Sequence, residues 1–272
     1  LTVAGSDSGG GAGIQADLKA ITLLGSYGSS VLTALTAQNT LGVTAIHAPP
    51  VDFVEQQLDA VLSDIGADVI KTGMLYSAEI ITAVAEKFRQ YGALCVIDPV
   101  MIAKGGSSLL QQSAIDAFIR ELLPQAYLLT PNIPEAEALT GQRISTIADM
   151  EQAAHTLQHM GARHVLVKGG HLAEDPVDVL RYADNTINLP GKRLDTPHTH
   201  GTGCTTASVI ATLLAQGFAL PQAVSQAKQF ITEAIATAPH IGQGHGPVNH
   251  YTAALTLVGA LYPTTFSEDT SS

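Results

Sequence analysis

The stretch that decides the fold stands at the start of the chain: LTVAGSDSGGGAGIQAD, residues 1–17. Leu1–Ala4 is a short apolar run typical of a buried strand, and Ile14, Leu18 and Ile21 repeat at the spacing of one helix face. The glycines between them predict a turn at which backbone N–H groups approach another group closely. A strand, a glycine-rich turn and a helix in this order predict the beginning of a β-α-β unit.

The rest of the chain continues this alternation of short apolar runs and segments of helical period. Further strands are predicted at Ser30–Ala37, Val43–His47, Asp68–Lys71, Leu94–Asp98, Tyr127–Leu129 and His164–Lys168. Val177–Tyr182 and Thr186–Leu189 predict a hairpin, and two helices are expected at about 203–216 and 221–238. The pattern predicts an α/β fold with a central, mostly parallel sheet in one domain, residues 1–260. Residues 261–272 are expected to form a flexible C-terminal tail.

Composition narrows the classes of partner. The 272 residues carry a net charge of −11, which argues against nucleic acid or an anionic membrane surface. Two cysteines, Cys95 and Cys204, do not make a disulfide framework, and no apolar run is long enough to span a membrane. A cytoplasmic protein is therefore expected. Because the chain does not begin with Met, a targeting segment upstream of Leu1 stays open.

The first glycine cluster also fits another class of site. Gly11–Ala16 matches the G-x-G-x-x-[GA] pattern of dinucleotide-binding turns. No acidic residue occurs between Asp17 and Asp52, however, where the ribose-binding acid should stand. Asp17 itself, expected in the first helical turn, would repel a pyrophosphate. A nicotinamide-dependent oxidoreductase is therefore the weaker alternative.

A second glycine turn, THGTGC at residues 199–204, precedes a run of small and apolar residues that predicts a helix. Its glycines, Gly201 and Gly203, favour anion binding by the helix N-terminus, although no lysine follows as in the Walker loop. A helix N-terminus lowers the pKa of a thiol, so a functional role is predicted for Cys204. Cys95, within the apolar run ALCVIDPV, is predicted to be a buried core residue.

Charged side chains follow three of the predicted strands. Asp98, Glu135 and Lys168 stand at or just after strand ends, where α/β sheets bind ligands. An acid pair, a lysine and an anion-binding turn are what phosphoryl transfer requires. A structural alternative for Glu135 is a capping box with Asn132 at the start of a helix.

Histidine pairs do not support a metal hydrolase. His155 and His159 are four residues apart but lack the glutamate of the zinc-protease motif. His198 and His200 alternate, so they would face apart in an extended segment.

The ordered set of motifs resembles one family. GSD (5–7), GGAGIQADLK (10–19), TALTAQNT (33–40), KTGM (71–74), DPVM (98–101), TPNIPEAEAL (130–139), VLVKGGH (165–171) and HGTGC (200–204) occur in this order in hydroxymethylpyrimidine and phosphomethylpyrimidine kinases of thiamin biosynthesis, members of the ribokinase-like superfamily. The likeness covers about residues 1–250. It implies a ribokinase-like three-layer sandwich and a phosphotransferase that uses ATP and Mg²⁺. The implied substrates are 4-amino-5-hydroxymethyl-2-methylpyrimidine and its monophosphate, and a homodimer is expected.

The resemblance also implies residue roles. The pyrimidine is expected near Gly5, Asp17, Gln38, Met74 and Val100. ATP is expected near Asn132, Lys168, Thr199, Thr202 and Lys228, and Mg²⁺ near Asp98 and Glu135. Cys204 is expected to take the proton of the substrate hydroxyl, while Lys168 and the amides of Gly201 and Gly203 stabilise the transferred phosphoryl group. A thiol with a pKa near 8.5 suits a base at neutral pH better than an unperturbed aspartic acid.

Two features depart from the family pattern. The first loop has Ser8-Gly9-Gly10 where a proline-serine-glycine order is expected. Asp98-Pro99-Val100 also resembles pyridoxal kinases of the same superfamily, so pyridoxal or pyridoxine remains the alternative substrate.

Overall fold

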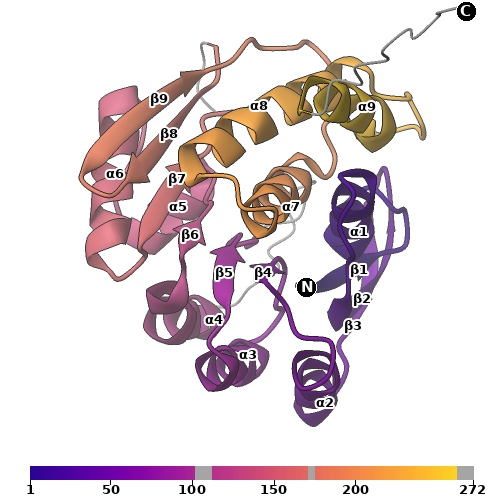
Figure 1. Cartoon of the computed structure of the whole chain (residues 1–272), viewed down its shortest axis with the longest axis vertical. Coiled ribbons are helices and arrows are strands. Elements are labelled where there is room, and N and C mark those ends of the chain that lie inside the picture. The colour runs from indigo at the N-terminus through magenta and orange to yellow at the C-terminus, as the bar shows by residue number, and fades with distance from the viewer. Residues whose placement is uncertain (102–111, 171–174, 262–272) are drawn as a thin grey trace, which may run out of the picture.

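The computed structural model describes residues 1–101, 112–170 and 175–261. Within these residues one nine-stranded sheet runs through the molecule in the order β3-β2-β1-β4-β5-β6-β7-β8-β9 (Figure 1). The strands are β1 (Thr2–Asp7), β2 (Ser30–Asn39), β3 (Gly42–His47), β4 (Val69–Thr72), β5 (Leu94–Ile97), β6 (Leu128–Leu129), β7 (His164–Val167), β8 (Val177–Tyr182) and β9 (Asn185–Pro190).

The sheet changes direction of winding beside β1. This strand pairs in parallel with β2 on one side, with Val3 opposite Val31, and with β4 on the other, with Val3 opposite Thr72. Pairing stays parallel through β7, whereas the pairs β2–β3, β7–β8 and β8–β9 are antiparallel. Ligands of open α/β sheets bind outside the carboxyl ends of the strands where the winding reverses, so the ends of β1 and β4 mark the expected cleft.

Two layers of helices cover the sheet and make the three-layer sandwich. One layer contains α1 (Gly13–Leu23), α7 (Thr202–Ala215), α8 (Leu220–Ala236) and α9 (His250–Leu261), which contact one another (Figure 1). The opposite layer contains α2 (Val51–Leu62), α3 (Ala78–Tyr91), α4 (Gln112–Ala117), α5 (Ile133–Thr140) and α6 (Ile147–His159). A π turn at Phe118–Leu122 and a 3₁₀ turn at Leu123–Gln125 follow α4. Each layer buries its own apolar cluster against the sheet.

Local sequence explains the ends of several helices. The Ser77 hydroxyl accepts from the Ile80 N–H at the start of α3, and Gly92 ends that helix with a φ of 67°. Asn132 and Glu135 form a capping box at the start of α5. The structural alternative considered for Glu135 is therefore confirmed, and it fixes this side chain at the edge of the sheet.

The predicted strands and the two predicted helices after the hairpin are confirmed, with differences at their ends. β2 continues to Asn39, and the β8–β9 turn has only two residues, Ala183 and Asp184, with Ala183 at a φ of 50°. The helix α9 was not predicted, because its sequence has no charged residue to mark a polar face. The predicted tail lies outside the described residues except for Leu261, which ends α9.

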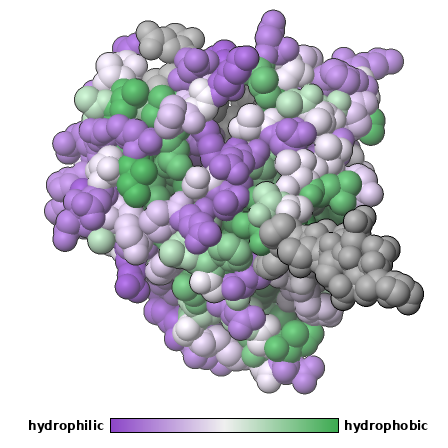
Figure 2. Space-filling model, turned by 45° about the horizontal axis from the view of Figure 1, so that its top comes forward, coloured by the Kyte–Doolittle hydropathy of each residue, from purple (hydrophilic) through white to green (hydrophobic). Residues whose placement is uncertain are grey.

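The surface does not point to a large apolar interface on the side drawn in Figure 2, where hydrophobic patches are separated by hydrophilic residues. The homodimer therefore stays a prediction. Within the described part of the chain, every helix is too short or too polar to cross a membrane.

Candidate active site

A cleft of about 450 Å³ lies at the carboxyl ends of the parallel strands. Its walls come from segments far apart in the chain, and they include most of the predicted site residues: Gly5, Gln38, Met74, Asp98, Val100, Asn132, Glu135, Lys168, Thr199, Gly201, Thr202, Gly203 and Cys204. Two predicted residues, Asp17 and Lys228, do not line it.

The second glycine turn brings the start of α7 to the floor of this cleft. Gly201 has a φ of 85°, and a Cβ there would overlap the carbonyl oxygen of Gly11. The turn can therefore pack against the first glycine loop only with glycine at this position. No side chain caps α7, and its Thr202 N–H lies 3.4 Å from the Thr199 oxygen, so the N–H groups of Gly203 and Cys204 are the donors left for an anion.

Cys204 lies in the first turn of α7, half-buried and lining the cleft. The prediction that the helix N-terminus lowers its pKa is wrong. Burial raises the pKa of the Cys204 thiol to about 11, against the opposing effects of the Lys71 ammonium and the Gly13 backbone N–H. Desolvation outweighs the helix dipole, and the Asp17 and Asp98 carboxylates raise the pKa of Cys204 further.

Lys168, directly after β7, reaches the start of α7. Its Nζ lies 2.7 Å from Asp98 Oδ1, which also accepts from the Thr130 hydroxyl at 2.9 Å. A Cβ at Gly203 would stand 3.4 Å from Lys168 Nζ. Burial lowers the pKa of Lys168, but the carboxylates of Asp98 and Glu135 outweigh it and leave a net increase. The lysine is therefore charged and lies beside the uncapped turn.

Glu135 adds a second carboxyl group to the same wall. Its Oε2 accepts from the Asn132 N–H at 2.8 Å as part of the capping box. Burial raises the pKa of Glu135 to about 7, partly offset by Lys168, and the Asp98 carboxylate raises it further. The Asp98 carboxylate disfavours the charged form of Glu135, so a bound cation would stabilise this wall, and Mg²⁺ prefers such oxygen ligands.

Asp17 lies beneath the cleft and not in its wall. Lys71 Nζ lies 2.9 Å from both of its carboxylate oxygens, which also accept from Thr2 Oγ1 at 2.6 Å and Ser208 Oγ at 2.7 Å. Asp17 is 0% exposed and Lys71 is 1% exposed. Direct contact of Asp17 with a substrate is therefore corrected to a supporting role. Asp17 also lies outside the first turn of α1, because that helix begins at Gly13.

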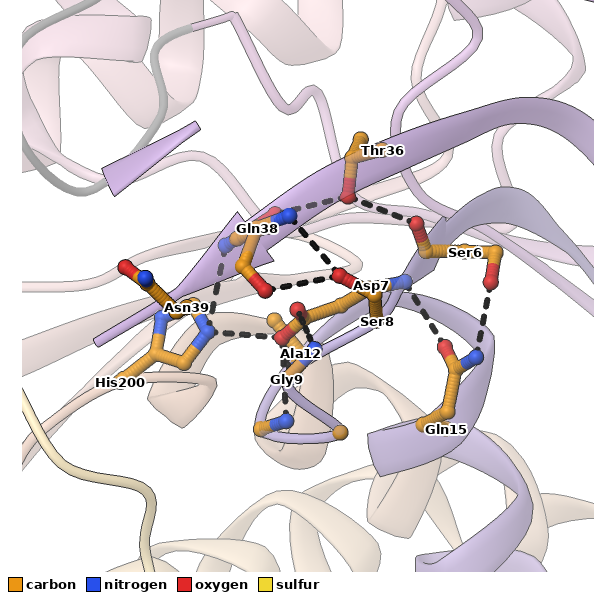
Figure 3. A network of polar contacts seen from close by, with 12 residues as sticks. Ser6, Asp7, Ser8, Gly9, Ala12, Gln15, Thr36, Gln38, Asn39 and His200 are labelled. Carbon is orange, nitrogen blue, oxygen red and sulfur yellow. Dashed lines mark hydrogen bonds and ion pairs between the residues drawn. The ribbon is translucent and has the colours of Figure 1, made fainter. Parts of the chain in front are cut away.

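Sequence reasoning missed Asp7 and His200, which also line the cleft. His200 Nε2 lies 2.8 Å from Asp7 Oδ2, and the same oxygen accepts from the N–H groups of Gly11 and Ala12 (Figure 3). His198 turns away and packs on His240, as the alternation predicted. The position of Asp7 at the end of the first strand was the available clue, but its histidine partner is 193 residues away.

A second cavity of about 310 Å³ adjoins the first. The two share Asn132, Lys168, Thr199, Thr202 and Gly203. Lys228 lines this second cavity, where its Nζ lies 2.6 Å from Asp178. Other walls combine cationic and apolar side chains: Lys192, Arg193, Leu194, Ile231 and Ile235.

The other cysteine and the histidine pair lie away from the cleft. Cys95 is 1% exposed in the core, and burial raises its pKa to about 12. The ring centroids of His155 and His159 lie 4.1 Å apart, with the rings tilted by 43°. No group of three or more metal-ligating side chains of the histidine, cysteine and acidic types occurs among the described residues.

Phosphoryl transfer to a small molecule needs a place for the acceptor next to a place for the nucleotide, with cationic groups and amides where the two meet. The adjoining cavities, the uncapped turn and Lys168 provide this arrangement. The sandwich and its site thus define a phosphotransferase of the ribokinase-like class.

Comparison with known proteins makes the assignment specific. The chain belongs to the phosphomethylpyrimidine kinase family, whose model matches residues 7–249. It is 59% identical over 256 residues to the thiamine biosynthesis bifunctional protein ThiED of Geobacter sulfurreducens, a match that covers 93% of this chain and 52% of that protein. The chain therefore spans about half the length of that relative.

Two further relatives match over nearly their whole length. The hydroxymethylpyrimidine/phosphomethylpyrimidine kinase of Bacillus subtilis is 48% identical, with 92% of this chain and 94% of that protein covered. The structure of the Staphylococcus aureus pyridoxal kinase with AMP-PCP and pyridoxal superposes with a TM-score of 0.86 at 37% identity, covering 93% of both chains.

Proposed function

We propose that this chain transfers the γ-phosphoryl group of ATP to 4-amino-5-hydroxymethyl-2-methylpyrimidine, and then a second phosphoryl group to the resulting monophosphate. The observation that carries the proposal is the meeting of two cavities at the start of α7, where Lys168, Thr202 and Gly203 line both. The larger cavity would hold the pyrimidine and the smaller one the nucleotide.

The pyrimidine side is built for a flat ring with a polar edge. Gln38 supplies an amide with a donor and an acceptor, which suits an aminopyrimidine. Met74 and Val100 supply apolar contact surface, and a Cβ at Gly5 would press on the Met74 side chain at 2.6 Å. The ring would lie between these groups with its hydroxymethyl arm toward Cys204.

The nucleotide side carries positive charge where phosphates would lie. Thr199, Thr202 and Asn132 would contact the phosphates beside Lys168, and Lys228 would lie farther along the nucleotide. Asp98 and Glu135 would hold Mg²⁺, which when bound neutralises charge on the phosphate oxygens. The residues fit that ion because both carboxyl groups line the cleft. Burial raises the pKa of Glu135 to about 7, and the Asp98 carboxylate raises it further.

In the transfer itself, the substrate hydroxyl oxygen attacks the γ-phosphorus in line, the bond from that phosphorus to the β–γ bridging oxygen breaks, and ADP leaves. The hydroxyl loses its proton as the new O–P bond forms. Cys204 Sγ accepts that proton in its thiolate form, which is the minor form at neutral pH because burial raises the pKa of the thiol to about 11. Lys71 and the Gly13 N–H favour the thiolate against its burial. Lys168 and the amides of Gly201 to Cys204 stabilise charge on the transferred group, and this positioning supplies most of the acceleration.

The test compares ATP consumption and product formation with the hydroxymethylpyrimidine, its monophosphate and pyridoxal. Pyridoxal is the second candidate substrate because of the superposition on a pyridoxal kinase. Cys204→Ala should lower turnover about 100- to 10,000-fold and leave ATP affinity nearly unchanged. Cys95→Ala is the matched control, since that cysteine is buried in the core, and it should keep its turnover. Wild-type turnover in Cys204→Ala would contradict the role of the thiol.

A further inference from the structure

His200 and the side-chain amide of Gln38 lie in contact on the wall of the cleft, and what we infer from this contact rests on the proposed function. The side-chain amide of Gln38 lies between two polar side chains (Figure 3). Its Nε2 is 3.3 Å from His200 Nε2, and its Oε1 is 3.1 Å from Thr36 Oγ1. Both nitrogens are donors if His200 carries a proton on Nε2. The two ends of an amide have similar shape, so the hydrogen-bond network decides which atom lies where.

Asp7 fixes the proton on His200 Nε2. Asp7 Oδ2 lies 2.8 Å from this nitrogen and already accepts from two backbone N–H groups. Burial raises the pKa of Asp7, but its hydrogen bonds with His200 and the loop amides outweigh it and leave the pKa lowered. A carboxylate accepts and never donates, so His200 must donate. A Gln38 N–H at that place would face another donor, whereas the Gln38 oxygen can share the His200 N–H with Asp7, so the oxygen is the amide atom that fits there.

Thr36 gives the same answer independently. Its hydroxyl lies 2.9 Å from the Ser6 carbonyl oxygen, which only accepts, and 3.1 Å from the Gln38 amide. A hydroxyl has one hydrogen, and Ser6 takes it. The amide atom at Thr36 must therefore be the donor nitrogen. One orientation of Gln38 satisfies both neighbours, and the opposite orientation satisfies neither.

We propose that His200, held by Asp7, is a positioning residue that locks the Gln38 amide with its oxygen toward the α7 turn, so that the site selects a 4-amino over a 4-oxo pyrimidine. The lock leaves one lone pair and one N–H of Gln38 for the ligand. In the substrate, the 4-amino group is adjacent to the hydroxymethyl arm that must face Cys204. His200 and Cys204 belong to the same turn, so the amide oxygen meets the amino group and the amide N–H meets the ring nitrogen.

A 4-oxo analogue reverses this pattern, because its ring nitrogen donates and its exocyclic oxygen accepts. The locked amide would then face donor with donor and acceptor with acceptor, which rejects the analogue. An unlocked amide can rotate and accommodate it. His200 is 8% exposed and Asp7 is 3% exposed, so water does not readily replace either contact.

The experiment measures dissociation constants of 5-hydroxymethyl-2-methylpyrimidine with a 4-amino or a 4-oxo group by calorimetry without ATP. We expect wild type to favour the amino compound by about 100-fold or more, and His200→Leu to lower that ratio by about tenfold or more. His200→Gln, which keeps an N–H donor, should restore part of it. His198→Leu is the matched control, because His198 contacts Gly246 and His240 but not Gln38.

Each outcome decides the matter. A folded His200→Leu variant with the wild-type ratio overturns the lock and leaves the kinase proposal intact. If His200→Leu does not fold, Thr36→Val tests the other side of the amide, and an unchanged ratio there overturns the lock equally. Wild type that binds neither pyrimidine contradicts the proposed function and the inference together.

Discussion

Asp17 and Lys71 form a buried ion pair, and replacing one or both of them should change stability and turnover to different extents. Asp17→Asn removes the charge that compensates Lys71, which is 1% exposed and cannot reach water. Breaking one side of such a pair costs about 3–5 kcal/mol. At about 2–4 °C per kcal/mol for a chain of this size, the melting temperature should fall by about 6–20 °C.

Replacing the whole pair has a different expected result. Asp17→Leu with Lys71→Met removes both charges of the pair. The Ser208 hydroxyl can turn to a carbonyl oxygen of its own helix, but the buried Thr2 hydroxyl loses its acceptor at a cost of about 1–3 kcal/mol, so the free energy of unfolding should return to within about 3 kcal/mol of wild type. Turnover should be lower than in wild type, because the Lys71 ammonium lowers the pKa of Cys204 more than the Asp17 carboxylate raises it, and both are gone. Urea unfolding followed by circular dichroism gives the stability, and the ATP-consumption assay gives the turnover.

The control is Lys87→Met, which breaks the ion pair with the half-exposed Asp59. Exposed pairs contribute about 0–1 kcal/mol, so this variant should be nearly as stable as wild type. Equal losses in Asp17→Asn and Lys87→Met would refute the energetic reasoning. Full turnover in the double variant would refute the link from Lys71 to Cys204.

Two other predictions concern the same end of the fold. Burial lowers the pKa of His250 to about 4, and its Nε2 lies 2.8 Å from the Thr205 hydroxyl. Between about pH 6.5 and 4, His250 is protonated in the unfolded chain but neutral in the native chain. Above pH 6.5 His250 therefore adds about 3 kcal/mol to the free energy of unfolding, and this stabilisation is lost as the pH falls to 4. Urea midpoints at pH 7 and 4.5 should differ less in His250→Gln, and an equal difference would exclude this histidine as the cause. Gly201→Ala should cost at least about 1–3 kcal/mol, because its Cβ would overlap the Gly11 oxygen at a φ of 85°. Gly217→Ala, at a φ of 88° with nothing within 4 Å, should show the backbone strain alone, so similar losses at both sites would contradict the overlap.

Local patterns predicted much of the architecture because their causes are local. Apolar runs between segments of helical period predicted the strands, since a parallel strand buried on both faces must be apolar along its length. The three-residue spacing between Asn132 and Glu135 predicted a capping box, which is present in the structure. The helix α9 was not predicted, because a run of apolar and small residues is compatible with either a buried helix or a strand.

The candidate site divides in the same way. The glycine turns and the charged strand ends were predictable because parallel strands place their carboxyl ends at one edge. The cleft contains nearly all of those residues. Asp17 was assigned wrongly because nothing near it in the sequence reveals Lys71, 54 residues away, as its partner.

By itself, the sequence determined the alternation of strands and helices, the two glycine turns and the types of residue available for chemistry. The tertiary structure alone decided which charges are paired and which thiol is enclosed. The pKa of Cys204 depends on burial between α1, α7 and the sheet, and the orientation of Gln38 depends on a histidine 162 residues farther along the chain. Desolvation and hydrogen-bond pairing act over a few ångströms in space, whatever the separation along the chain, so these properties arise only when the fold brings the groups together.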